Sequence, residues 1–131
     1  MPTGGCHCGA IRFEVSGECE HCALCHCDDC RRSSGAPMVG WIAFKSNLAK
    51  LTQGSPAEYA SSADGRRRFC GICGTGLFFM NEEVLPGLID VQLATFDDPA
   101  AFTSAAHIQT ADRLHWMETA HELPQFERYP G

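Results

Sequence analysis

Short segments in which apolar and polar residues alternate recur along most of the chain. Residues 11–15 alternate apolar side chains with polar or charged ones, which is the period of a strand with one buried face. Less regular versions of this pattern predict strands over residues 21–24, 38–44, 66–69, 76–80 and 88–93. Turn residues separate these segments, including Gly4-Gly5 and the stretches 33–35, 54–56, 63–65 and 86–87. Short strands at this spacing predict a mainly β, antiparallel architecture.

Helix is expected to be minor. Asp98 followed by Pro99 is typical of an N-cap and a first helical position, so one turn is predicted over residues 97–102. Residues 112–123 predict a second short helix, and the last nine residues, with two prolines, predict an irregular arm. The 131 residues are 44% hydrophobic, so we expect one core and a single domain over residues 1–131. Four aromatic residues are expected in that core: Trp41, Phe78, Phe79 and Trp116.

The composition excludes several classes of protein. No stretch approaches the ~18 apolar residues of a membrane span, and no basic segment precedes an apolar run at the N-terminus. We therefore expect a cytoplasmic protein with no membrane partner. A net charge of −6 argues against a nucleic-acid partner. Nine cysteines cannot all pair within one molecule, so metal ligation accounts for them better than a disulfide framework.

One group of cysteines combines two distant segments. Cys6 and Cys8 lie near the N-terminus, while Cys70 and Cys73 belong to a Cys-x-x-Cys-Gly sequence typical of a zinc knuckle. Together they supply four thiolates, which predicts a closed, structural zinc site. A redox role for Cys70 and Cys73 would need a βαβ setting, which the pattern does not indicate.

A second group contains Cys25, Cys27 and Cys30 within six residues. Three cysteines can converge on one ion if the chain wraps tightly around it, which leaves a fourth position for water or substrate. The intervening His26 is expected to point away as a supporting or surface residue, although as a ligand it would close the site.

Two cysteines, Cys19 and Cys22, remain outside both groups. Cys22 is expected to be a small buried side chain. The alternative is that either of them supplies a fourth sulfur and closes the second site. A redox pair formed by these two cysteines is a further alternative and would require a depressed pKa.

Five of the ten Lys and Arg residues lie within four positions of Cys30 or Cys70. They are Arg31, Arg32, Arg66, Arg67 and Arg68. Their positive charge could compensate the thiolates, or it could form a rim that binds a substrate carboxylate through the planar fork of arginine. Both interpretations remain open.

The sequence resembles the glutathione-dependent formaldehyde-activating enzyme (GFA) family, also called the centromere protein V family. The resemblance rests on residues 5–13, 25–36 and 69–75, and continues through 94–99, 107–108 and 112–116. It implies a β-tent, or Mss-four-like, fold of antiparallel sheets around a structural zinc. It also implies two zinc ions per chain, a structural one on Cys6, Cys8, Cys70 and Cys73 and a catalytic one on Cys25, Cys27 and Cys30.

The same resemblance implies a carbon–sulfur lyase activity. The thiol of glutathione would add to formaldehyde, or to a related small electrophile, in forming S-hydroxymethylglutathione, and the reverse reaction would cleave it. Glutathione carries carboxylates, so four residues next to the second group are candidates for binding it: Arg31, Arg32, Ser33 and Ser34. The alternative is a non-catalytic zinc-binding interaction module in which both sites are closed.

Overall fold

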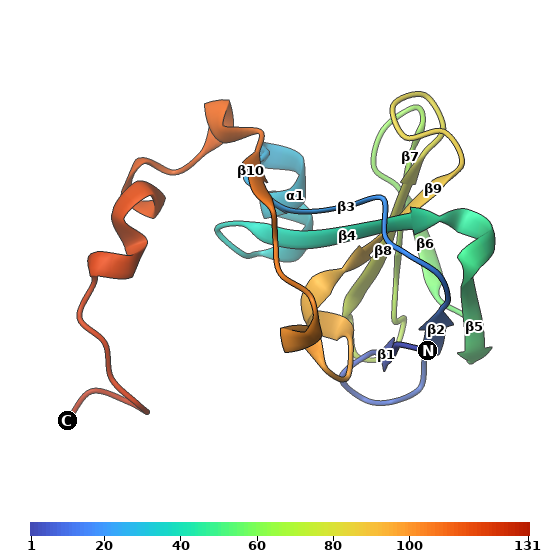
Figure 1. The fold of residues 1–131 in the computed structure, drawn as a ribbon, viewed down its shortest axis with the longest axis horizontal. Coiled ribbons are helices and arrows are strands. Elements are labelled where there is room, and N and C mark those ends of the chain that lie inside the picture. Colours follow the sequence, from blue (N-terminus) through green and yellow to red (C-terminus); the bar gives the residue numbers. More distant parts are fainter.

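The computed structural model describes all 131 residues and contains two β-sheets (Figure 1). The smaller sheet has the strand order β1-β2-β5, and the larger, seven-stranded sheet has the order β10-β3-β4-β9-β8-β7-β6. Every strand pair is antiparallel except β10 with β3, which is parallel. The mainly β fold is thus confirmed, and the antiparallel prediction is wrong for this one pair.

The elements have the following bounds. The strands are β1 (Thr3–Gly5), β2 (Arg12–Val15), β3 (His21–Cys25), β4 (Val39–Lys45), β5 (Ala49–Gln53), β6 (Ala57–Ala60), β7 (Gly65–Phe69), β8 (Gly76–Asn81), β9 (Leu88–Gln92) and β10 (Ala106–Ile108). The helices are α1 (Asp28–Ser34) and the 3₁₀ segments η1 (Ser46–Leu48), η2 (Leu93–Thr95), η3 (Pro99–Ala101), η4 (Thr110–Asp112) and η5 (His115–Glu122). The six strands predicted from alternation are confirmed as β2, β3, β4, β7, β8 and β9.

The four strands that sequence patterning missed, β1, β5, β6 and β10, all lie at sheet edges. β5, β6 and β10 each form an edge and are largely exposed, so they bury no face and show no clear alternation. The predicted turn at Gly4-Gly5 is wrong, because both residues belong to β1. A Cβ on Gly4 would lie 2.5 Å from the ring of Phe13, so glycine here permits close packing.

The helix α1 replaces the expected turn at residues 33–35. Its N-cap is Cys27, and two acidic residues, Asp28 and Asp29, occupy the first turn, where negative charge favours a helix. Gly35 ends it in the left-handed conformation, with φ 73°. These are the ordinary start and stop signals of a helix, and they could have been found in the sequence.

The main core lies between the two sheets. In the larger sheet, Ile42, Val91 and Phe78 are in register across β4, β9 and β8, and all three are buried. Phe13 and Val15 of β2 belong to the same cluster. Neighbouring side chains of a strand face opposite sides, so Trp41 points to the other face of the sheet. There it packs with Cys25 and Cys30 in a second, smaller cluster.

The C-terminal segment leaves this body. After β10 the chain runs away from the sheets, through η4 and η5, to an irregular end (Figure 1). Trp116 is 43% exposed, so its prediction as a core residue is wrong. The one-turn helix η3 and the short η5 confirm that helix is minor. None of the helices has the length and apolar character that crossing a bilayer would require.

Candidate metal centres

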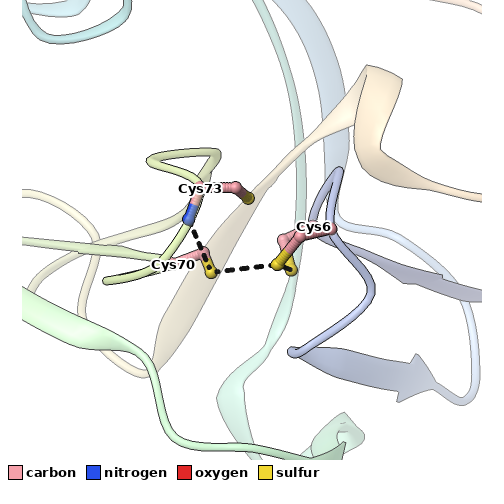
Figure 2. A group of neighbouring side chains, drawn as sticks. Cys6, Cys70 and Cys73 are labelled. Atoms are coloured by element: carbon pink, nitrogen blue, oxygen red, sulfur yellow. Dashed lines mark hydrogen bonds between the residues drawn. The ribbon is translucent and has the colours of Figure 1, made fainter.

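The first cysteine cluster joins the N-terminal segment to the middle of the chain. The sulfur atoms of Cys6, Cys8, Cys70 and Cys73 all lie within 4.8 Å of one another. Figure 2 shows Cys6, in the loop after β1, facing Cys70 and Cys73, in the loop after β7. The Sγ atoms of Cys6 and Cys8 are 3.6 Å apart, and those of Cys8 and Cys70 are 3.8 Å apart. A tetrahedral zinc–thiolate centre requires S···S separations of about 3.8 Å, so these four residues fit zinc.

The two loops hold their sulfurs by similar backbone geometry. Gly9 and Gly74 both have φ 83°, and their N–H groups donate to the carbonyls of Cys6 and Cys70 at 3.1 and 2.9 Å. A residue with a Cβ would be strained at either glycine. The amide of Ile11 then donates to Cys6 Sγ at 3.2 Å. Amide donors stabilise a thiolate, so this hydrogen bond favours the deprotonated form of Cys6.

A threonine connects the two loops. The Thr75 hydroxyl lies 3.2 Å from Cys73 Sγ and accepts the backbone N–H of His7 at 3.0 Å. Its hydrogen bonds, hydroxyl first and then backbone, lower the pKa of Cys73 to about 5. Thr75 therefore both ties the segments together and favours the thiolate form that binds a metal.

The second cluster lies on the opposite face of the larger sheet. The sulfurs of Cys25, Cys27 and Cys30 lie within 4.8 Å of one another, and no other Cys, His, Asp or Glu joins this group. Cys25 ends β3, Cys27 caps α1, and Cys30 lies in the first helical turn. The Cys30 amide donates to Cys27 Sγ at 3.2 Å, so the N-cap interaction itself positions two of the sulfurs.

A buried arginine faces this cluster. Arg67, on β7, is 7% exposed. Its Nη2 donates to Asp29 Oδ2 at 2.6 Å and lies 3.7 Å from Cys30 Sγ, and its guanidinium stacks 4.6 Å from the centre of the Phe79 ring. Hydrogen bonds from Cys25, Cys27, Arg67 and Trp41 lower the pKa of Cys30. The contacts of Arg67 therefore fit the interpretation in which arginines compensate the negative charge of the thiolates.

The other two thiols behave differently. Hydrogen bonding with Cys30 and burial raise the pKa of Cys25, and burial raises that of Cys27. The cluster therefore favours one thiolate, at Cys30, and the remaining protons leave when a metal ion replaces them. Soft sulfur donors of this kind fit zinc.

His26, between two of these cysteines, points away from them. It is fully buried, so the prediction that His26 could be a surface residue is wrong. Its Nε2 lies 2.9 Å from Nδ1 of His107. Its backbone N–H donates to the carbonyl of Ile108 at 3.1 Å. The parallel pairing of β10 with β3 creates both contacts, so they could not be found from the sequence of either segment alone.

The two remaining cysteines also lie outside the cluster. Cys22 is buried in the main core, as expected, whereas Cys19 is exposed. Burial, followed by the nearby Cys19, raises the pKa of Cys22. A raised pKa argues against a reactive redox pair at these positions.

The four predicted substrate-binding residues are placed differently from one another. The hydroxyls of Ser33 and Ser34 donate to the Cys30 carbonyl at 3.2 and 2.7 Å. Arg31 pairs with Asp28 and donates to the carbonyl of His26. Arg31 and Arg32 line a hollow on another side of α1, away from the second cluster's cavity. Of the four, only Ser33 reaches that cavity.

This cavity adjoins the second cluster and measures about 490 Å³. Trp41 and Arg67 line the cavity and also contact Cys30, so they separate the cavity from the sulfur atoms by a single layer of side chains. The full lining is Ser33, Trp41, Glu58, Tyr59, Arg67, Arg68, Phe69, Gly74, Gly76, Phe78 and Gln92. Tyr59 and Gln92 carry no motif, so sequence reasoning missed them, whereas two members of the basic run over residues 66–68, Arg67 and Arg68, do line the cavity.

The fold and the two clusters together define a mainly β protein whose thiols could hold two metal ions. The sequence profile of the family described as glutathione-dependent formaldehyde-activating enzyme matches residues 1–112, and the chain belongs to this family.

Three known proteins are similar to this chain. An uncharacterized lyase of Schizosaccharomyces pombe is 32% identical over 76 residues, which span 58% of this chain and 55% of that protein. A Halomonas elongata protein named “Putative glutathione-dependent formaldehyde-activating enzyme” is 26% identical over 126 residues, covering 88% of this chain and 78% of its own length. A crystal structure of a Rhodobacter sphaeroides protein, 22% identical, superposes with a TM-score of 0.64 over 80% of this chain and 98% of its own. This last similarity concerns the fold alone.

Proposed function

We propose that this chain is a zinc-dependent carbon–sulfur lyase that adds the thiol of glutathione to formaldehyde or a related small electrophile. One observation carries the proposal: three cysteine sulfurs converge, without a fourth protein donor, next to a cavity of about 490 Å³. Membership of the family and the names of the two relatives agree with this activity.

Each cluster has a distinct proposed role. Four thiolates complete a tetrahedral zinc shell, so Cys6, Cys8, Cys70 and Cys73 would hold a structural ion. Three thiolates leave one position for a substrate, so Cys25, Cys27 and Cys30 would hold a catalytic ion. When bound there, zinc would supply a coordination position that favours loss of the proton from a thiol.

The proposed reaction forms one carbon–sulfur bond. The sulfur of glutathione attacks the carbonyl carbon of formaldehyde, the carbonyl π electrons move to oxygen, and that oxygen takes up one proton. The thiol gives up one proton, so the addition releases none overall, and the reverse reaction breaks the same bond. Arg67 would hold Cys30 in place through its contacts, while Trp41 and Phe79 would keep water from this side of the cluster.

The activity can be tested by exchange spectroscopy. Zinc-loaded protein is mixed with glutathione and ¹³C-formaldehyde, and NMR measures the rate of exchange with S-hydroxymethylglutathione. We expect exchange faster than in a protein-free control, and a return to that control rate in Cys27→Ser. Cys19→Ser is the matched control, because Cys19 is exposed and outside both clusters. Equal rates for the wild type, Cys27→Ser and the protein-free sample would reject the proposal.

Zinc X-ray absorption separates this proposal from a non-catalytic zinc module. In the proposed enzyme, adding glutathione increases the average number of sulfur ligands per zinc, because one ion gains a thiolate. In a module with two closed sites, the sulfur number stays constant. Cys70→Ser, which alters only the first cluster, should leave the glutathione-dependent increase in place.

A further inference from the structure

Three consecutive arginines on β7 differ in how many of their donors are already used. Arg66 Nη1 donates to three carbonyls of residues 62–65, at 3.1, 3.2 and 2.7 Å. Arg67 is buried against Asp29 and Cys30. Arg68 makes one hydrogen bond, from Nε to Glu58 Oε1 at 3.1 Å. Its two terminal nitrogens have no protein partner, so its fork is available to a ligand.

The pair formed by Glu58 and Arg68 lies on the wall of the cavity. The two residues are directly opposite each other on β6 and β7, and both line the cavity whose wall includes Trp41 and Arg67, the residues that contact Cys30. Their side chains are 46% and 39% exposed, and Glu58 Oε2, like the Arg68 fork, makes no hydrogen bond with the protein. An exposed ion pair of this kind contributes little to stability, so its members can exchange partners with a ligand at small cost.

We propose that Glu58 and Arg68 form a subsite for a zwitterionic α-amino acid group, an inference that rests on the proposed glutathione function. The Arg68 fork matches the two oxygens of an α-carboxylate, and Glu58 accepts from the neighbouring α-ammonium. Adjacent positive and negative groups fit a ligand that carries both charges. The γ-glutamyl end of glutathione has this chemistry, and its flexible arm lets the thiol extend along the cavity toward Arg67 and Trp41, the lining residues that contact Cys30.

The substrate class follows from this pairing. Thiols with a free α-amino acid group should bind best, whereas thiols that carry only a carboxylate or only an ammonium should bind less tightly. Arg31 and Arg32 line a different hollow, so this subsite replaces them as the anchor for the charged end of the substrate.

The subsite can be tested without any reaction. Isothermal titration calorimetry on the zinc-loaded full chain would use S-methylglutathione, which has no free thiol, and its N-acetyl derivative, which has no ammonium. We expect the wild type to bind S-methylglutathione about tenfold more tightly than the acetylated probe, a difference typical of one charged hydrogen bond. Equal affinity for the two probes, or no binding of either, would overturn the proposal.

Two variants identify the residues. Glu58→Gln should weaken the binding of S-methylglutathione by about tenfold and the binding of the acetylated probe by less than about twofold. Arg68→Gln should weaken the binding of both probes by about tenfold. Glu118→Gln, in an exposed ion pair with Arg113 away from the cavity, is the control and should change neither affinity. If Glu58→Gln weakens both probes equally or neither, the assignment of Glu58 is wrong.

The result is independent of the lyase activity. A chain that discriminates between the probes but does not accelerate exchange with formaldehyde has the subsite and lacks the reaction. A chain that accelerates exchange and binds both probes equally has the reaction and lacks the subsite.

Discussion

Asp90 is a buried carboxyl whose replacement by asparagine should stabilise the protein above pH 6. It lies on β9 between Ala43 and Phe79, is 6% exposed, and its Oδ1 has no hydrogen-bond partner. Burial raises the pKa of Asp90 from its ordinary value of 3.8 to about 6; the charge of His21 lowers it and that of Cys30 raises it by smaller amounts. The folded protein therefore holds this proton more tightly than the unfolded chain.

The sign and size of the effect follow from proton linkage. Between pH 3.8 and about 6 the folded state binds more protons at Asp90 than the unfolded state does, so stability falls as pH rises through this window. The shift spans about two pKa units, and each unit corresponds to about 1.4 kcal/mol, so the loss is about 3 kcal/mol. Asparagine has no charge to lose, so Asp90→Asn should avoid this loss.

Urea denaturation at a series of pH values measures this pH-dependent loss of stability. Wild type and Asp90→Asn are compared from pH 4 to pH 8 at equal zinc concentration, so that the pH dependence of metal binding largely cancels in the difference. We expect the free energy of unfolding of the variant, relative to wild type, to rise by about 3 kcal/mol across this range. Asp64→Asn, at an exposed carboxyl, should show no such rise. A pH-independent difference for Asp90→Asn would refute the reasoning.

Three further changes test other parts of the structure. His107→Ala removes the partner of the buried His26 and should lower the free energy of unfolding, measured by urea denaturation, by about 1–3 kcal/mol. The same change should speed the release of one zinc ion, but not both, to a chelator. Unchanged release of both ions would contradict this prediction. Arg67→Met removes the cation beside Cys30 and should likewise speed release of only one ion, whereas Arg66→Met, whose side chain contacts only backbone carbonyls, should not. Deleting residues 124–131, which are all exposed, should change the free energy of unfolding by less than about 0.5 kcal/mol, and a larger loss would show that this arm packs on the body.

Local patterns were sufficient for much of the fold and for the composition of both clusters. Apolar patterning identified the six strands that bury at least one face; the period of two is regular in β2, whose buried and half-buried residues alternate, and is lost in β4 and β9, which are buried on both faces. Cys70 and Cys73 were recognisable as candidate metal ligands because a Cys-x-x-Cys-Gly sequence lies within a few consecutive residues. The start and stop signals of α1 were equally local, and they were missed only because residues 33–35 also resemble a turn.

The tertiary structure decided how distant residues combine. The pairing of β10 with β3 turned two unremarkable histidines into a buried contact, and no pattern in either segment contains that register. The register of β6, β7 and β8 also decided that Arg67 faces Cys30 while Arg68 faces Glu58. In sequence these two arginines are equivalent neighbours. Adjacent side chains of a strand point to opposite faces, so their partners depend on what each face meets, and only the assembled sheet determines that.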